Sequence, residues 1–255
     1  MYGNTHIFES MEALYEALEN HWRLIAKHAI DDHGAFFVAL AGGSTPRKFY
    51  ERLAKQDQIS NHEWKKTHIY FGDERCVPQG HEDSNYRMVK ESLLSKVALL
   101  PEHVHAMFSA DMSMKDNVEN YNLLLNGELP LDGQGHPVFD LVMLGMGEDG
   151  HTASLFPGTE ILNVSESPVA SQFVKKLDSW RMSLTFPSIN AARHVAIIVA
   201  GEGKAEILSA VFSEVESGEE FYPIQKVRPA GQLDWYLDVA AARQLLDREK
   251  GQSKS

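Results

Sequence analysis

Four short runs, each of which ends at or beside a glycine, constrain the fold of this chain more than any other feature. Their side chains are mostly apolar on both faces, apart from isolated polar residues such as Asp140. Runs of this kind fit strands that are buried on both sides in the middle of a parallel sheet. They lie at residues 36–41, 67–72, 139–145 and 194–200.

Segments with the residue spacing of amphipathic helices separate these runs. The first is predicted to be capped by Ser10 and to end before Gly34, with Phe8 and Trp22 on its apolar face. Further helices are predicted at residues 47–56, 85–97, 116–126, 187–193, 205–212 and 237–246, and weaker strands at 169–177 and 181–187. Strands that alternate with helices predict an α/β fold with a mostly parallel sheet flanked by helices.

The chain is predicted to form one domain. Its 255 residues are enough for one large domain or two small ones. The loop at residues 131–137, with two glycines and a proline, is the best candidate for an internal linker, but the composition does not change there. We therefore expect a single α/β domain over residues 1–255, with a frayed polar tail at residues 248–255.

The charge of the chain limits the partners that it can have. Twenty-four Lys and Arg against 36 Asp and Glu give a net charge of −12, while 43% of the residues are hydrophobic. A globular protein with a real core is expected, and the acidic field disfavours binding to nucleic acid. A small anionic substrate remains possible where a few basic side chains converge.

The cysteine content and the apolar runs indicate a compartment. The only cysteine, Cys76, can form no disulfide within the chain, which favours a reducing compartment. The first ten residues do not resemble a secretory signal, and no apolar run approaches the roughly 20 residues of a membrane span. We expect a cytoplasmic protein without membrane contact, either a monomer or a small homo-oligomer.

The loop after the third run concentrates polar chemistry at a strand end. Gly145, Gly147 and Gly150 allow sharp turns, and Asp149 and His151 lie among and after them. In open α/β sheets, ligands bind outside the carboxyl ends of the strands. This loop is therefore the first candidate for an active site.

The other strand ends carry groups that suit an anion. The sequence Gly42-Gly43-Ser44-Thr45 precedes a helix and offers free N–H groups and two hydroxyls. Asp73, Glu74 and Arg75 follow the second run directly, and Lys204 lies in the turn after the fourth. The first of these turns could as well be an ordinary strand-to-helix connection with Ser or Thr as its cap, and the charged segment after the second run could be a solvated loop.

Several short motifs suggest cofactors or metals, but their context argues against each. The glycines at positions 145, 147 and 150 match a dinucleotide fingerprint, yet Pro157 interrupts the helix that should follow. The turn at Lys204 lacks the remaining residues of a phosphate-binding P-loop. His103 and His105 have no third ligand at metal spacing, and Ser154 is not in a nucleophile elbow. No metal and no organic cofactor are predicted.

Taken together, these segments resemble the 6-phosphogluconolactonase family. The matching stretches, in the order of the family, are LAGGSTP (40–46), YFGDERCVP (70–78), DSNYRM (83–88), LGMGEDGHTASLFPGT (144–159), RMSLTFPSINAAR (181–193) and GEGK (201–204). The resemblance implies cytoplasmic hydrolysis of 6-phosphoglucono-δ-lactone, a small sugar-phosphate lactone, in the oxidative pentose phosphate pathway without a cofactor. It also implies a Rossmann-like sheet similar to that of glucosamine-6-phosphate deaminase.

The resemblance implies roles that fit the chemistry of the residues. Ester hydrolysis needs a base that activates water and a stabiliser for the tetrahedral oxyanion. His151 is the predicted base, and Asp149 orients or polarises it. Arg75 stabilises the oxyanion or the product carboxylate. Asp73 either orients Arg75 or a water molecule, or moves protons as its counterpart does in the deaminases.

A second group of residues is predicted to hold the phosphate group of the substrate. Its members are turn residues that offer N–H groups and hydroxyls, together with two cations. They are Gly42, Gly43, Ser44, Thr45, Arg181 and Lys204.

Two alternatives use the same scaffold. A sugar-phosphate deaminase or isomerase carries a glutamate after the Asp-Gly-His element, where this chain has Phe156, which cannot relay a proton. A non-catalytic sugar-phosphate sensor would need Arg181 and Lys204 but not His151. The presence of Phe156 favours the lactonase over the deaminase, and the presence of His151 and Arg75 favours an enzyme over the sensor.

Overall fold

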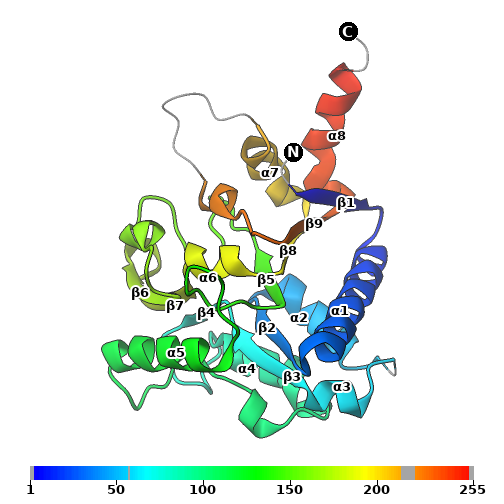
Figure 1. The fold of residues 1–255 in the computed structure, drawn as a ribbon. Helices are drawn as coiled ribbons and strands as arrows, with labels where there is room; N and C mark the ends of the chain where they lie inside the picture. Colours follow the sequence, from blue (N-terminus) through cyan, green and yellow to red (C-terminus); the bar gives the residue numbers. More distant parts are fainter. Residues whose placement is uncertain (1–2, 57, 214–221, 253–255) are drawn as a thin grey trace.

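A six-stranded parallel sheet forms the centre of the molecule (Figure 1). In the computed structural model, which describes residues 3–56, 58–213 and 222–252, all neighbouring strands of this sheet run parallel. In spatial order, the strands are β1 (Asn4–Phe8), β9 (Gln232–Asp238), β8 (His194–Val199), β5 (Leu141–Gly145), β2 (Phe36–Leu40) and β3 (Thr67–Phe71). The four predicted apolar runs form the four strands from β8 to β3, and the predicted α/β class with a mostly parallel sheet is confirmed.

Helices cover this sheet and connect its strands. The longest, α1, crosses the sheet and contacts β1, β9 and β2, whereas α7 and α8 pack against each other beside β9 (Figure 1). The helices are α1 (Met11–His33), α2 (Ser44–Leu53), α3 (Asn61–Lys65), α4 (Asn85–Ser92), α5 (Met114–Glu128), α6 (Phe186–Ala191), α7 (Ala205–Val211) and α8 (Val239–Gln252). Short 3₁₀ turns are η1 (Leu94–Lys96), η2 (Pro101–His103), η3 (Glu160–Asn163), η4 (Lys175–Leu177), η5 (Glu202–Lys204) and η6 (Pro223–Lys226).

A second, antiparallel sheet of three strands lies beside the carboxyl end of β3. Its order is β4 (Asp73–Arg75), β7 (Ser179–Leu184) and β6 (Val169–Val174). The chain passes from β3 into β4 through Gly72, whose carbonyl accepts a hydrogen bond from the Leu184 N–H at 2.8 Å. The second sheet therefore places side chains of β4 and β7 over the carboxyl edge of the first.

Several local predictions are confirmed by helix caps and by the packing of side chains. The Ser10 hydroxyl accepts from the Ala13 N–H at the start of α1, and Gly34 ends that helix with a left-handed φ of 85°. Ser84 caps α4 in the same way. His103 and His105, expected to be packed or solvated, stack with His68 and Tyr70.

Other boundaries differ from the prediction. Phe8 belongs to β1 and not to the face of α1, and α4 ends at Ser92 because a 3₁₀ turn follows Leu93. β9 occupies residues up to Asp238, so that the last helix begins at Val239 and continues to Gln252, into the segment expected to fray. Strands β1, β9 and β4 and the separate second sheet were not predicted.

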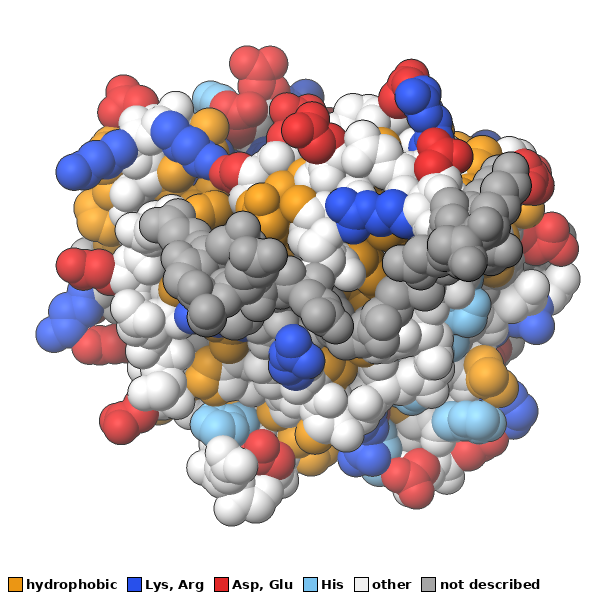
Figure 2. Space-filling view, turned by 90° about the horizontal axis from the view of Figure 1, so that it is seen from above, with side chains coloured by type: hydrophobic (Ala, Val, Ile, Leu, Met, Phe, Trp, Pro, Cys, Tyr) orange, Lys and Arg blue, Asp and Glu red, His pale blue; other side chains and the backbone are white. Residues whose placement is uncertain are grey.

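The surface and the buried regions bear on the remaining expectations. Figure 2 shows acidic, basic and histidine side chains interspersed with apolar atoms on one face, so charge there is mixed. No helix in the described ranges is long and apolar enough to cross a membrane. Among the same residues, no group of three or more His, Cys, Asp or Glu side chains is arranged to hold a metal ion. Burial raises the pKa of the Cys76 thiol to about 12, so this cysteine is no nucleophile at neutral pH.

Candidate active site

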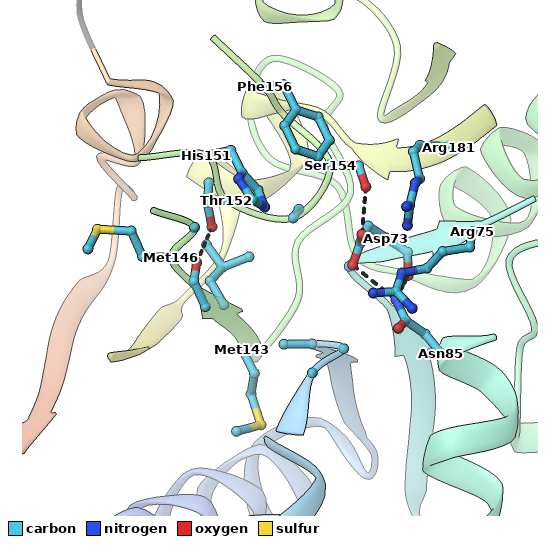
Figure 3. A pocket seen from close by; sticks show the side chains of 18 of the residues that line it. Asp73, Arg75, Asn85, Met143, Met146, His151, Thr152, Ser154, Phe156 and Arg181 are labelled. Atoms are coloured by element: carbon cyan, nitrogen blue, oxygen red, sulfur yellow. Dashed lines mark hydrogen bonds between the residues drawn. The ribbon is translucent and has the colours of Figure 1, made fainter. Parts of the chain in front are cut away.

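A cavity of about 470 Å³ opens at the carboxyl ends of β2, β3, β5 and β8 (Figure 3). This is the edge at which an open parallel sheet binds its ligands. The predicted site residues that line the cavity come from five different segments. They are Gly42, Gly43, Asp73, Arg75, His151, Arg181 and Lys204.

The glycine-rich turn after β5 presents His151 to the cavity. The Gly147 N–H donates to the His151 carbonyl at 2.8 Å, and Gly150 takes a left-handed φ of 71°. A Cβ atom on Gly147 would lie 2.0 Å from His151 Nδ1, so only glycine leaves room for the imidazole ring. The Thr152 hydroxyl donates to the Gly145 carbonyl at 2.8 Å and ties the far side of the turn to the strand.

Asp149 holds one nitrogen of His151. Its Oδ1 atom lies 2.5 Å from His151 Nδ1 and also accepts from the His151 backbone N–H at 3.2 Å. Burial by itself would raise the pKa of Asp149, but hydrogen bonds from Lys176 and His151 outweigh it and hold that pKa below the ordinary range. An ionised Asp149 accepts a hydrogen bond from the N–H group at Nδ1, and in a neutral ring with its proton on Nδ1 the other nitrogen, Nε2, is an acceptor.

Two arginines face this pair from the opposite side of the cavity. Arg75 on β4 and Arg181 on β7 are direct cross-strand partners, and Figure 3 shows both guanidinium groups across the cavity from His151. Burial, followed by the charge of Arg75, lowers the pKa of Arg181, and no partner for the buried Nε of Arg181 is found among the described residues. Like charges opposite each other repel, so this arrangement is suited to an anion that contacts both.

Asp73 joins the two sides of the cavity. Its Oδ2 accepts from the Ser154 hydroxyl at 2.6 Å, and its Oδ1 lies 3.2 Å from Asn85 Nδ2. Asn85 in turn fills the space over Gly42, where an added Cβ would meet the Asn85 amide at 2.1 Å. Asp73 therefore links Ser154, in the loop that carries His151, to Asn85 at the start of α4, and fixes the position of one relative to the other.

A buried carboxyl group supports Arg75 from behind. Glu74 is 3% exposed and accepts from the backbone N–H groups of Arg75, Asn85 and Tyr86 and from the Ser84 hydroxyl. Burial raises the pKa of Glu74 to about 7, against the lowering effect of those N–H groups. These bonds fix the backbone of β4 relative to the N-terminus of α4 and so fix where the Arg75 side chain begins.

The residues predicted to bind phosphate are spread over a wider area. Gly42, Gly43 and Lys204 line the main cavity, whereas Ser44 lines a neighbouring cavity that also includes Arg47, Arg75 and Asn85. Thr45 lines neither cavity. Lys204 follows β8 and Arg181 lies on the second sheet, so these two cations reach the main cavity from different elements.

Four residues at the site were missed by the sequence reasoning. Asn85, Ser154, Phe156 and Lys176 all line the cavity, although none was predicted to take part in binding or catalysis. Asn85, Ser154 and Phe156 lie within the motifs that carry the resemblance, which is the signal that could have found them. Lys176 lies outside those motifs, and only the pairing of β6 with β7 brings it to the site.

The Phe156 ring occupies the position that distinguishes the two enzymatic hypotheses. Its centroid lies 4.2 Å from that of the His151 ring, so an apolar group covers the imidazole where the deaminases are expected to have a carboxylate. Lys176 lies on the tip of the β6–β7 hairpin, and its ammonium group is 4.6 Å from the Phe156 ring centroid. The residues that line the cavity thus include one histidine and several basic side chains, and Asp73 is the one acidic residue among them.

The fold and this site define an α/β protein equipped for acid–base chemistry on an anionic ligand. The chain belongs to the family of glucosamine-6-phosphate isomerases and 6-phosphogluconolactonases, whose model matches residues 9–235. A relative from Oryza sativa, a probable chloroplastic 6-phosphogluconolactonase, is 35% identical over 250 residues, with 94% of this chain and 75% of the relative covered.

Solved structures give the same relationship. The 6-phosphogluconolactonase of Trypanosoma brucei superimposes with a TM-score of 0.84 at 28% identity, over 95% of this chain and 98% of that one. A monomeric glucosamine-6-phosphate deaminase superimposes with a TM-score of 0.77 at 16% identity, over 94% and 99% of the two chains. The predicted similarity to the deaminase fold is therefore confirmed at the level of the fold.

Proposed function

We propose that this protein hydrolyses 6-phospho-D-glucono-1,5-lactone to 6-phospho-D-gluconate. The observation that carries the proposal is the Asp149–His151 pair facing Arg75 and Arg181 across one cavity. A base that can activate water and cations that can hold an oxyanion are the two requirements of lactone hydrolysis. The relatives named above support the choice of substrate.

The reaction can be written with these groups in sequence. His151 Nε2 takes a proton from water as the water oxygen forms a bond to the lactone carbonyl carbon. The carbonyl oxygen becomes an oxyanion, which we assign to Arg75 and Arg181. The tetrahedral intermediate then breaks its bond to the ring oxygen, and the imidazolium of His151 returns the proton to that oxygen. The product is the open-chain acid, which ionises.

The phosphate of the substrate is assigned to the groups that follow β8 and β2. Lys204 and the N–H groups of Gly42 and Gly43 follow β8 and β2 of the first sheet, whereas the arginine pair lies on the second sheet. Ser44 and Thr45, at the start of α2, add the positive end of a ten-residue helix. We therefore move Arg181 from the predicted phosphate group to the oxyanion group, because it lies directly opposite Arg75.

We further propose that the reaction needs neither metal nor organic cofactor and takes place in the cytoplasm, within one domain over residues 1–255. The acid–base groups and the cations come from the chain itself, and the single free cysteine suits a reducing compartment.

The decisive experiment is lactone hydrolysis by the purified protein beside its His151→Ala variant. The lactone is generated in situ and the acid followed through a coupled dehydrogenase, with the unaided hydrolysis subtracted. We expect the variant to lose roughly 10²–10⁴-fold in kcat/KM, because general-base catalysis contributes about that much. The matched control is His81→Ala, since His81 forms a second, exposed pair with Asp83 (3.6 Å) two residues along the chain.

Each outcome has a separate meaning. Loss in His151→Ala with full activity in His81→Ala supports the lactonase and the base. No acceleration by the wild-type protein rejects the lactonase, and ammonia release from glucosamine 6-phosphate then tests the deaminase. Equal acceleration by wild type and His151→Ala keeps the substrate but rejects His151 as the base.

A further inference from the structure

A lysine on the tip of the β6–β7 hairpin reaches the catalytic pair from outside the family motifs. Residues 175–178 form this tip, which turns at Asp178 with a left-handed φ of 45°. Lys176 pairs with Asp149 Oδ2, the carboxylate oxygen that His151 does not contact. Lys175, its neighbour on the same tip, has no ion pair with Asp149 in the described structure.

The ammonium of Lys176 contacts both groups that hold the His151 ring. Asp149 receives Lys176 on one oxygen and the His151 Nδ1 atom on the other. Phe156 has its ring centroid 4.2 Å from that of His151 and 4.6 Å from the Lys176 Nζ atom. Asp149 and Phe156, the two side chains that contact the imidazole, are therefore both contacted by the Lys176 ammonium as well.

We propose that Lys176 is a positioning residue for the His151 base: it fixes the Asp149 carboxylate and offsets part of its charge, so that this carboxylate favours the imidazolium less than it would alone. This inference rests on the proposed lactone hydrolysis for its kinetic consequences. Its structural basis, a lysine shared by both partners of the histidine, is independent of the substrate.

The physical reason is that an ionised carboxylate beside an imidazole favours the protonated ring. A cation on the far oxygen of that carboxylate opposes this effect, because it repels the imidazolium and offsets part of the carboxylate charge. The pKa of Asp149 lies below its ordinary value, so the carboxylate remains ionised over the working range and the cation remains paired. The pair is about half exposed, so its contribution to the free energy of folding is small.

Other charged groups act on the same histidine and must stay constant in any test. The His151 loop itself contributes Glu148, and the cavity wall contributes charges from β4, β7 and η5. The latter are Asp73, Arg75, Arg181 and Lys204. Because a substitution at position 176 leaves all of these in place, a change in the titration of His151 can be assigned to Lys176.

The test compares three variants of the full chain with wild type: Lys176→Met, Lys176→Arg and Lys175→Met as the matched control. The acid limb of the pH profile of kcat/KM reports the base in the free enzyme. We expect Lys176→Met to move that limb to higher pH by about 0.5–1 unit, the shift caused by losing one nearby charge. Lys176→Arg should restore the wild-type limb, and Lys175→Met should leave it unchanged.

A second measurement separates this proposal from the proposed function. The pKa of His151 is followed directly by the chemical shift of its Cε1–H proton in NMR titrations without substrate. The signal is identified among those of the 12 histidines by its loss in His151→Asn. We expect the midpoint to rise in Lys176→Met and to return in Lys176→Arg.

The possible results distinguish a positioning role of Lys176 from other roles. A midpoint and an acid limb that do not move in Lys176→Met overturn the proposal. An increase in KM with an unmoved limb would make Lys176 a substrate-binding cation and also overturn it. If the wild-type protein does not hydrolyse the lactone, the proposed function fails, but the NMR titration still decides the role of Lys176.

Discussion

His151 and the stack of His68, His103 and His105 differ in what their ring nitrogens contact. His151 has Nδ1 on a carboxylate and lines the cavity. In the stack, the His68 and His103 rings lie 3.7 Å apart, and His68 Nδ1, His103 Nδ1 and His105 Nε2 are buried without a hydrogen-bond partner in the described part of the chain. Three histidines therefore pack as flat aromatic groups, while His151 pairs with a carboxylate at the cavity.

The comparison shows how differently burial and a neighbouring carboxylate act on a histidine in this fold. Burial, followed by the neighbouring histidines, lowers the pKa of His68 to about 4, and burial also lowers the pKa of His105. Burial disfavours the charged form of both rings, although the charge of Glu128 opposes this effect at His105. At His151, by contrast, Asp149 contacts Nδ1, and this carboxylate would stabilise an imidazolium formed in the proposed hydrolysis.

The largest effect is expected from Asp149→Asn, which makes the His151 environment more like that of the stack. The amide introduced by this substitution can donate to Nδ1 of His151, which would leave the proton on Nε2 and remove the acceptor for water. We expect kcat/KM to fall by roughly 10²–10⁴-fold while the folded structure is kept. The coupled lactone assay measures the loss, and thermal unfolding checks the fold. Asp83→Asn, in the exposed His81 pair, is the control and should retain activity.

Much of the fold and part of the candidate site could be predicted from the sequence, because local patterns indicated both the strands and the loop that carries His151. Strands β8, β5, β2 and β3 are largely buried on both faces, so their runs are mostly apolar, and glycines mark the turn that carries His151. The edge strand β1 exposes most of its side chains and gives no such run. β4 consists of Asp73, Glu74 and Arg75, and only its pairing with β7 makes it a strand.

The parts of the site that escaped prediction depend on contacts between distant segments. Ser154 reaches Asp73 across 81 positions of the chain, and Lys176 reaches Asp149 across 27. Neither contact follows from periodicity or from spacing within a motif. The place of Arg181 opposite Arg75 likewise follows from the register of β4 and β7, which local patterns do not specify.

A smaller effect is expected from Gly147→Ala, which displaces His151 without changing its chemistry. The new methyl group would lie 2.0 Å from Nδ1 and 2.8 Å from Asp149 Oδ1, so the ring or the loop must shift. A displacement of about 1 Å from the productive geometry can cost on the order of 10²-fold in rate. Activity is compared with Gly80→Ala, where an added Cβ meets no atom within 4 Å. Equal activity in the two variants would contradict the assigned role of the turn.

The smallest effect is expected from His68→Phe, which keeps an aromatic ring in the stack but removes its titration. The His68 pKa of about 4 in the folded protein lies below its unfolded value of 6.5, so the unfolded chain takes up the proton first as pH falls. Wild-type stability due to this group is therefore complete above about pH 6.5 and is lost between there and about pH 4. The free energy of unfolding of the Phe variant should therefore fall by about 1–2 kcal/mol less than that of wild type over this pH window, allowing for partial exposure of the ring. Urea unfolding at several pH values measures the difference.

The activity of the same variant tests the comparison itself. An unchanged kcat/KM would show that the stack serves packing and, unlike His151, takes no part in hydrolysis. A clear loss of lactone hydrolysis in His68→Phe with the fold intact would break the comparison, because it would connect the stack to the cavity.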